Sequence, residues 1–332
     1  MYMPKVSIMI PTFNQDKYIL RAIQSAQSQS YPNLEIVISD DHSTDNTENI
    51  VQDFIKECSD DRVKYFRNTE NQGILRNYKT NLEENASGDW VINLDGDDFF
   101  IDNDYIVEAM NLIASDTSIK LIFGNYSEWY QSTEKMVDIT NRNLQQVMSD
   151  EEFFELYAND QIVWNHSSII YHRNSALALG FYWHETLPRN DWESFLRLIV
   201  GNKVGYLNRI SAAWVQHDAN ETRRLDINKY LKNFGRIKGV AQFAKDQGMR
   251  EDFIEQWYKK MLHKSARGSC IGYIRNRDFN GMIDFLKHVA KIDRFLVIKI
   301  LFDPSLALRA ILSINPNFYL QVKTVGRKLL SR

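Results

Sequence analysis

Short apolar runs alternate with longer amphipathic segments over roughly the first third of the chain. The apolar runs occupy residues 6–10, 34–39, 63–67 and 90–94, and helical periodicity occupies residues 17–29, 47–58 and 74–85. Strands that alternate with helices of about 10–15 residues are typical of βαβ units. We therefore predict an α/β fold whose sheet is Rossmann-like, mostly parallel and flanked by helices.

The pattern loosens beyond Ile101. It predicts a helix near residues 105–115, a strand at 120–126 and a mixed region to about residue 216, and only helical periodicity follows from residue 226. This change predicts a boundary near residue 220. We expect one domain over residues 1–220, with a first part over about 1–100 and a second over about 101–220, and a helical C-terminal region over residues 221–332.

Polar side chains follow three of the predicted strands at the point where each strand ends. Pro11-Thr12-Phe13-Asn14 follows the first strand, Asp40-Asp41 the second and Asp95-Gly96-Asp97-Asp98 the fourth. Ligands of open α/β sheets bind outside the carboxyl ends of the strands. The three loops are therefore expected to face one crevice.

The loop after the fourth strand holds three carboxylates within four residues, Asp95, Asp97 and Asp98. Such groups repel one another unless a positive charge lies among them, and hard divalent cations prefer oxygen ligands. Mg²⁺ or Mn²⁺ would balance these charges and also bind a diphosphate. A solvated acidic turn is the alternative, but the position at a strand end favours a metal site.

The loop after the second strand offers a carboxylate that can accept hydrogen bonds from the imide N–H of uracil or from ribose hydroxyls. We assign the contact with the base to Asp41. Ser43 and Asp45 are better explained as caps of the helix that follows.

Four segments occur in a characteristic order along the chain. They are Val-Ser-Ile-Met-Ile-Pro-Thr-Phe-Asn at 6–14, Ser-Asp-Asp-His-Ser-Thr-Asp-Asn-Thr at 39–47, Asn71 with Gly73, and Gly88-Asp89-Trp90 leading to Leu-Asp-Gly-Asp-Asp at 94–98. Together they resemble family 2 glycosyltransferases with the GT-A fold, over about residues 4–217. The resemblance implies metal-dependent transfer of a sugar from a nucleotide-sugar donor.

The resemblance also implies roles for individual residues. Thr12 and Asp41 would contact uracil, Asp97 the ribose or the metal, and Asp98 the metal and the diphosphate. The donor site would comprise Pro11, Thr12, Phe13, Asn14, Asp41, Arg76, Asp95 and Asp97, and the metal ligands would be Asp97, Asp98 and His217. Arg76 would contact phosphate from the segment after Gly73, although the stretch from Arg76 to Gly88 is longer than is common in the family.

Enzymes of this family commonly take the acceptor proton with an Asp that follows a Glu. This chain has Arg189-Asn190-Asp191-Trp192-Glu193, so Asp191 matches the base while Asn190 replaces the Glu. A single displacement with this base would invert the anomeric configuration. Capping of the following helix is the alternative role for Asp191. By family position, Trp164, Asn165 and His166 would lie on the acceptor side, although packing in the core is an equally good role for Trp164.

Composition adds few constraints. The net charge of −3 over 332 residues gives no general attraction to nucleic acid, and we predict no such partner. Cys58 and Cys270 stand in no metal-ligand spacing, and no signal-peptide pattern is present, so we expect a cytoplasmic protein. The oligomeric state leaves no pattern in the sequence.

The C-terminal region is rich in basic and apolar residues. The basic residues are Lys287, Lys291, Arg294, Lys299, Arg309, Lys323, Arg327, Lys328 and Arg332, interleaved with the apolar residues Phe295, Leu296, Ile298, Ile300, Leu301 and Phe302. Two readings stay open: a helix on the anionic inner face of the cytoplasmic membrane, or a helical appendage packed on the first domain. The apolar stretch is too short to span a bilayer, which needs roughly 20 residues.

These observations predict an inverting transferase that moves a sugar from a nucleotide-sugar, with UDP-sugar as the expected donor, to a hydroxyl of a surface polysaccharide or lipid-linked glycan. A metal-dependent nucleotidyltransferase is one alternative, but the segment from Pro11 to Lys17 lacks a glycine-rich basic loop. A catalytically silent module that binds sugar-nucleotide or glycan is another. The presence of Asp97, Asp98 and Asp191 argues against it.

Overall fold

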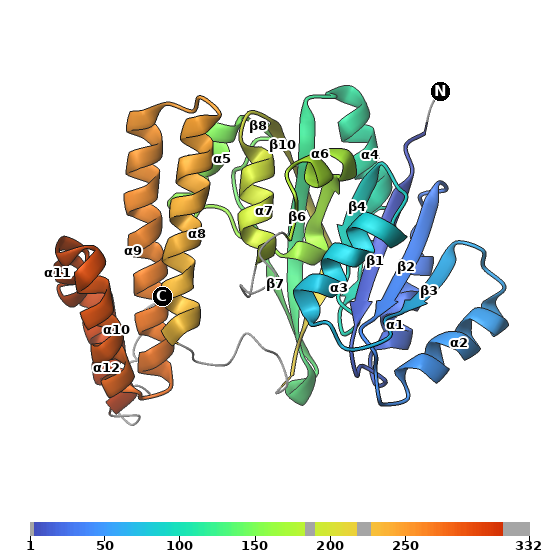
Figure 1. Ribbon diagram of the computed structural model, residues 1–332, viewed down its shortest axis with the longest axis horizontal. Helices are drawn as coiled ribbons and strands as arrows, with labels where there is room; N and C mark the ends of the chain where they lie inside the picture. Colours follow the sequence, from blue (N-terminus) through green and yellow to red (C-terminus); the bar gives the residue numbers. More distant parts are fainter. Residues whose placement is uncertain (1–2, 183–189, 218–226, 315–332) are drawn as a thin grey trace, which may run out of the picture. The chain divides into compact units, whose positions relative to one another are not determined.

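The first apolar run forms strand β1 (Val6–Thr12), which is buried along its whole length. The structure is a computed structural model that describes residues 3–182, 190–217 and 227–314 (Figure 1). The chain divides into two compact units, Met1–Asn220 and Glu221–Arg332.

Strand β1 lies at the centre of a parallel half-sheet. Its neighbours are β2 (Leu34–Asp40) and β4 (Trp90–Asn93), and β3 (Val63–Arg67) pairs with β2 at the edge. The connections contain α1 (Ile19–Gln27), α2 (Thr47–Cys58) and α3 (Ile74–Thr80), the last followed by a π-helical turn at Asn81–Asn85. Because helices cover such a sheet, its central strands β1 and β2 are buried at every residue.

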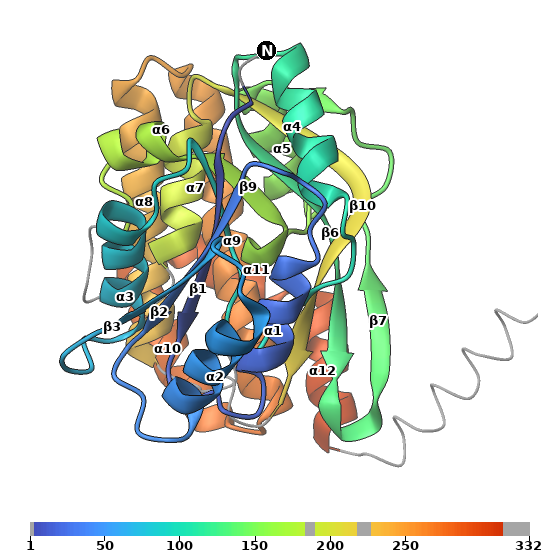
Figure 2. The same cartoon turned by 90° about the vertical axis from the view of Figure 1, so that its right-hand side faces the viewer.

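The second half of the sheet is mixed. Strand β9 (Ile169–His172) runs antiparallel to β4 and to β6 (Ile119–Tyr130), and the long β10 (Lys203–Gln216) runs parallel to β6. Three short strands complete this half, namely β5 (Phe99–Phe100), β7 (Lys135–Ile139) and β8 (Val147–Met148), and Figure 2 shows β7 alongside β6. The predicted α/β fold with a sheet flanked by helices is confirmed, but parallel pairing dominates only in the first half.

Helices of this unit bury one apolar face each. In α1 the buried residues are Ile19, Ala22, Ile23 and Ala26, at the spacing of one helical face. They belong to the core that also contains Ile8, Ile36 and Ile92 from the parallel strands. The other helices of this unit are α4 (Tyr105–Ser115), α5 (Asp150–Ala158), α6 (Arg173–Ala178) and α7 (Asn190–Ile199). This packing fixes the carboxyl ends of β1, β2 and β4.

The second unit consists, over its described residues, of helices joined by short turns. It contains α8 (Ile227–Asp246), α9 (Glu251–Arg275), α10 (Phe279–Ile292), α11 (Arg294–Leu301) and α12 (Pro304–Ile314), of which α8 and α9 form a long pair (Figure 1). No helix among the described residues is long and apolar enough to span a membrane. The basic residues Lys323, Arg327, Lys328 and Arg332 lie outside the described residues.

Candidate active site

Hydrogen bonds join the loops after β1 and β2. The Asn14 amide N–H donates to Ser43 Oγ at 2.9 Å, and the Thr44 amide N–H donates to Asn14 Oδ1 at 2.8 Å. Asn14 adopts a left-handed conformation, with φ of 53°. Pro11 and Thr12 are buried, whereas Phe13 and Asn14 are exposed at the edge of the sheet. Two of the three predicted loops therefore form one connected rim.

Asp40 and Asp41 are both buried, but their partners differ. The Asp40 carboxylate accepts hydrogen bonds from the Ser43 amide at 2.8 Å and from the Tyr65 hydroxyl at 2.7 Å. These bonds tie the end of β2 to its own loop and to β3. Asp40 therefore has a structural role.

Asp41 organises the loop that follows β3. Its carboxylate accepts hydrogen bonds from the backbone amides of Gln72 and Gly73, both at 2.8 Å, and from the Asn68 side chain at 2.9 Å. Gly73 has φ of 88°, a conformation that side chains other than glycine rarely adopt. These three donors occupy part of the hydrogen-bond accepting capacity of Asp41. The contact of Asp41 with uracil stays a prediction.

The acidic loop after β4 folds closely against the end of β1. A Cβ atom at Gly96 would displace the side chains of Gln15 and Thr12, so glycine allows the close approach of this loop to β1. The short strand β5 then pairs with β10, with Phe99 opposite Ala213. The loop is thus held between β1 and the last strand of the sheet.

Asp97 faces His217 at the end of β10. The distance from His217 Nε2 to Asp97 Oδ2 is 2.9 Å, and Tyr18 stacks on the imidazole with ring centroids 5.1 Å apart. The side chains of Asp97 and His217 are 16% and 14% exposed, so solvent and ligand can still reach them. The sequence prediction placed this pair in one metal site.

Asp98 is buried with one oxygen unsatisfied. Its Oδ1 accepts a hydrogen bond from the Val215 amide at 2.9 Å, and its buried Oδ2 has no hydrogen-bond partner among the described residues. Burial, followed by the nearby charges of Asp97 and Asp95, raises the pKa of Asp98 well above its ordinary value. A buried carboxylate without a partner is costly, and a cation would satisfy it.

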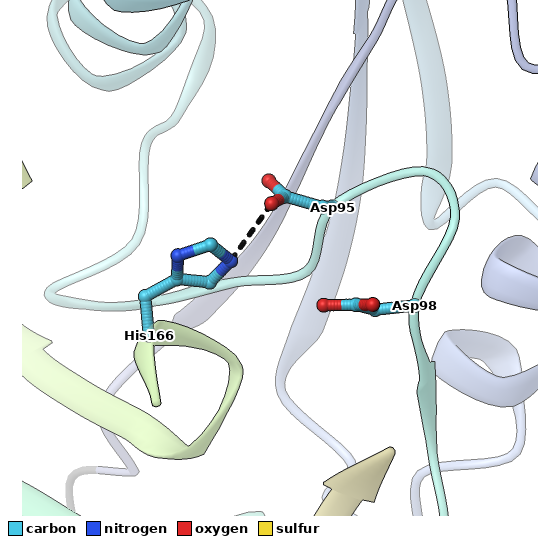
Figure 3. A group of neighbouring side chains, drawn as sticks. All are labelled: Asp95, Asp98 and His166. Atoms are coloured by element: carbon cyan, nitrogen blue, oxygen red, sulfur yellow. Dashed lines mark ion pairs between the residues drawn. The ribbon is translucent and has the colours of Figure 1, made fainter. Parts of the chain in front are cut away.

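Asp95 lies between Tyr78 and His166. The Tyr78 hydroxyl donates a hydrogen bond to one oxygen of Asp95, and His166 Nε2 lies 3.0 Å from the other. Figure 3 shows Asp95 and Asp98 near His166, and the potential ligand atoms of these three residues all lie within 4.8 Å of one another. This group shares only Asp98 with the predicted set of Asp97, Asp98 and His217: Asp95 stands in place of Asp97, and His166, predicted on the acceptor side, stands in place of His217.

His166 connects this loop with Asp191. Its Nδ1 lies 3.8 Å from Asp191 Oδ2, at the start of α7. Burial alone would lower the pKa of His166, but the charges of Asp95 and Asp191 raise it well above its ordinary value. A protonated imidazole is a counter-ion and cannot ligate a metal. In this state His166 bridges the acidic loop and the predicted base.

The remaining predicted residues divide into packed and exposed ones. Trp164 packs among aromatic rings, with centroids 5.0 Å from Phe153 and 5.5 Å from Tyr157. Asn165 Oδ1 caps the short helical turn at His166–Ser168. Both therefore position His166. Arg76 is exposed on α3, with no ion pair to a described residue.

Sequence reasoning missed Tyr18 and Tyr78. Tyr18 directly precedes α1 and stacks on His217. Tyr78 lies in α3 and bonds to Asp95, while its ring stacks on Tyr182 with centroids 5.3 Å apart. The residues next to a tyrosine in the sequence do not indicate which distant side chain its ring or hydroxyl will contact. Neither contact could therefore be predicted from the sequence.

A parallel half-sheet with polar loops at its carboxyl ends, here carrying carboxylates that face two histidines, is typical of nucleotide-binding α/β proteins. Residues 7–170 match the family described as Glycosyl transferase family 2. Residues 7–170 therefore form a family 2 glycosyltransferase domain within the first unit.

Two relatives and one solved structure are similar to the chain. A GalNAc(5)-diNAcBac-PP-undecaprenol beta-1,3-glucosyltransferase of Campylobacter jejuni is 44% identical over 96 residues, which cover 29% of this chain and 30% of the relative. The UDP-Glc:alpha-D-GlcNAc-diphosphoundecaprenol beta-1,3-glucosyltransferase WfgD of Escherichia coli is 34% identical over 121 residues, which cover 36% of this chain and 45% of the relative. The matched segments thus span less than half of the length of either relative.

The crystal structure of S. aureus TarS 1-349 in complex with UDP-GlcNAc has the same fold. Its TM-score is 0.63 at 17% identity, and the match covers 85% of this chain and 81% of that chain.

Proposed function

We propose that this chain transfers a sugar from a UDP-sugar to a hydroxyl of a lipid-linked glycan or surface polysaccharide, with inversion of the anomeric centre. The observation that carries the proposal is the meeting of Asp97 and His217 at 2.9 Å beside the strand-end loops. The names of the two relatives, both glucosyltransferases with undecaprenol-linked substrates, support the reaction and the acceptor class. Family membership favours this function over nucleotidyl transfer.

The donor would lie across the ends of β1, β2 and β4. Phe13 and Asn14 are exposed at this rim, and the exposed cation of Arg76 is available to a phosphate. The ordered loop that Asp41 anchors would border the uracil. The four-residue run from Pro11 to Asn14 would carry the base contact together with Asp41.

A divalent cation, Mn²⁺ or Mg²⁺, fits this donor set. The unsatisfied Oδ2 of Asp98 lies in the acidic loop, and the side chains of Asp97 and His217 are partly exposed. Cations of this class are commonly held by one or two carboxylates together with substrate phosphates. We propose Asp97, Asp98 and His217 as its ligands by family position, and Asp95, Asp98 and His166, whose potential ligand atoms lie within 4.8 Å of one another, as the alternative group. When bound, the cation offsets the charge that develops on the departing diphosphate.

Asp191 would act as the general base. Its carboxylate would take the proton of the acceptor hydroxyl while that oxygen bonds to the anomeric carbon, and the bond from this carbon to the diphosphate oxygen breaks. The electron pair leaves with UDP. The protonated His166, 3.8 Å from Asp191, would fix the carboxylate in place. Attack opposite the leaving group inverts the configuration.

We place this reaction in the cytoplasm, at the inner face of the cytoplasmic membrane, where the lipid part of the acceptor would hold it. The protein would be a peripheral component there.

Isothermal titration with UDP, with and without Mn²⁺, tests the donor site. We expect metal-dependent binding by the wild type, loss of the metal dependence in Asp97→Asn and His217→Ala, and wild-type behaviour in Asp53→Asn, which changes an exposed carboxylate of α2. Metal-independent binding by all variants would refute the cation assignment. No binding at all would favour another nucleotide or a silent module.

A turnover assay tests the base. With UDP-glucose and a short-chain diphospholipid-linked GlcNAc, Asp191→Asn should lower the rate by about a thousandfold, as expected for loss of general base catalysis. Metal-dependent UDP binding should persist in this variant. Glu155→Gln, on the exposed face of α5, is the control. A product with retained anomeric configuration by NMR would contradict the single displacement.

A further inference from the structure

Helix α11 exposes an apolar strip although it belongs to a packed helical unit. Phe295 is 76% exposed, Ile298 50% and Phe302 81%. Phe295 and Ile298 lie on one face of the helix, and Phe302, the C-cap residue directly after Leu301, continues the spacing at i+7. The opposite face is buried through Leu296 and Ile300, which are 4% and 3% exposed. Packing therefore accounts for one side of α11 and leaves the other, more apolar side in water.

Basic side chains border this strip. Arg294 and Lys299 lie on either side of it along α11, and Lys291 ends α10 just before it. In the part of the chain that the structure describes, neither these three cations nor Arg309 of α12 forms an ion pair. The border therefore carries uncompensated positive charge.

The acidic residues nearby are engaged within the protein. Asp293 Oδ1 accepts a hydrogen bond from the Leu296 amide at 3.1 Å and so caps α11. Asp303 pairs with Arg267 at 2.8 Å. Among the described residues, neither carboxylate forms an ion pair with a cation around the strip. A partner that binds this face should therefore have an apolar region that can bury the exposed side chains and negative charges that can contact the basic ones.

We propose that the face made by Phe295, Ile298 and Phe302, with Arg294 and Lys299 at its sides, docks on an anionic lipid bilayer. Aromatic and aliphatic side chains enter the boundary between headgroups and acyl chains, while flanking basic residues contact the anionic headgroups. The helix lies in the plane of the surface. This inference extends the proposed use of a lipid-linked acceptor, yet the surface itself requires neither donor nor acceptor.

Flotation of the purified full chain with vesicles tests the proposal without any turnover. The wild type should float with vesicles of phosphatidylglycerol and phosphatidylcholine, and far less with phosphatidylcholine alone. Phe295→Ser/Phe302→Ser should bind at least about tenfold more weakly, since each loses a large apolar side chain. Arg294→Gln/Lys299→Gln should lose about fivefold for each charge and respond less to salt.

The control is Leu20→Ser/Met136→Ser, which changes two apolar residues of similar kind, each 40% exposed, in the other unit. It should bind vesicles like the wild type. Equal flotation of Phe295→Ser/Phe302→Ser and the wild type would overturn the proposal. So would self-association of the wild type that these substitutions abolish while it fails to float, because the face would then bind a second copy. Loss of flotation with intact UDP binding, or the reverse, separates this proposal from the proposed reaction.

Discussion

The acidic loops after β2 and β4 lie on either side of β1, and they use their carboxylates in opposite ways. Asp40, at the end of β2, has both oxygens bonded to donors of its own chain, the Ser43 amide and the Tyr65 hydroxyl. Asp98, after β4, has one oxygen bonded to the Val215 amide and one without a partner among the described residues. Both side chains are buried. Burial of an acidic residue at a strand end therefore does not separate a folding role from a ligand role, whereas the count of its hydrogen bonds does.

The largest expected effect is that of Asp98→Asn. The neutral amide keeps the shape and relieves the buried charge, so thermal stability without metal should not fall. Transfer should drop by about a thousandfold, because a cation ligand is lost. Kinetics and a melting curve on one preparation would check both halves of this prediction. A marked loss of thermal stability in Asp98→Asn would contradict this contrast, since Asp98 would then have a structural role like that of Asp40.

The pH dependence of protein stability tests the structural role of another buried carboxylate in β2, that of Glu35. Burial alone would raise the pKa of Glu35, but hydrogen bonds from Lys5 and Ser7 help lower it to about 2. A lowered pKa in the folded state stabilises the protein above the unfolded value, and that stabilisation is lost as pH falls from about 4.5 toward 2.

Glu35→Gln should therefore cost about 3 kcal/mol at neutral pH, with the difference narrowing as the solution is acidified. Urea unfolding at a series of pH values measures this. If the two proteins differed by the same free energy of unfolding at every acidic pH, the stabilisation would not come from the charge of Glu35.

Asp40→Ala should destabilise the protein by about 2 kcal/mol, because the Ser43 amide and the Tyr65 hydroxyl lose a charged acceptor. Chemical denaturation gives the value, and UDP binding at low temperature should stay within about twofold of wild type if this carboxylate serves only the fold. Selective loss of UDP binding would instead move Asp40 to the ligand site.

The smallest effect is expected for Tyr78→Phe. This variant removes the hydroxyl that donates to Asp95 while keeping the ring, so transfer should fall about fivefold. Tyr18→Phe is the matched control, because the Tyr18 hydroxyl bonds to Gln131 and its ring, not its hydroxyl, contacts His217. Equal loss in both variants would show that the effect does not depend on the hydrogen bond to Asp95.

The parallel half of the fold could be predicted from local patterns. The helix over 47–58 and the strand over 63–67 have the expected bounds. The direction of β9 could not be predicted, since an apolar run of four residues carries no sign of whether its partners run parallel to it. That run turns the second half of the sheet into a mixed one.

The candidate site was only partly accessible to sequence reasoning. The carboxylates of Asp95, Asp97 and Asp98 are visible as a cluster, but the pairing of Asp97 with His217 spans 120 positions and came from the family resemblance. The contacts of His166 with Asp95 and Asp191 depend on how β9 and α7 pack, which no local pattern encodes. The roles of the individual residues in catalysis remain predictions.

Strand β10 also sets the order of events during folding. Its residues Val215 and Gln216 and the adjoining His217 lie far along the chain from the acidic loop, yet Val215 bonds to Asp98 and His217 faces Asp97. Contacts between such distant positions form late, because long loops must close first. The proposed cation site is therefore complete only after the last strand has entered the sheet. A nascent or partly refolded chain would carry the acidic cluster without its histidine, and so would remain inactive until the sheet is complete.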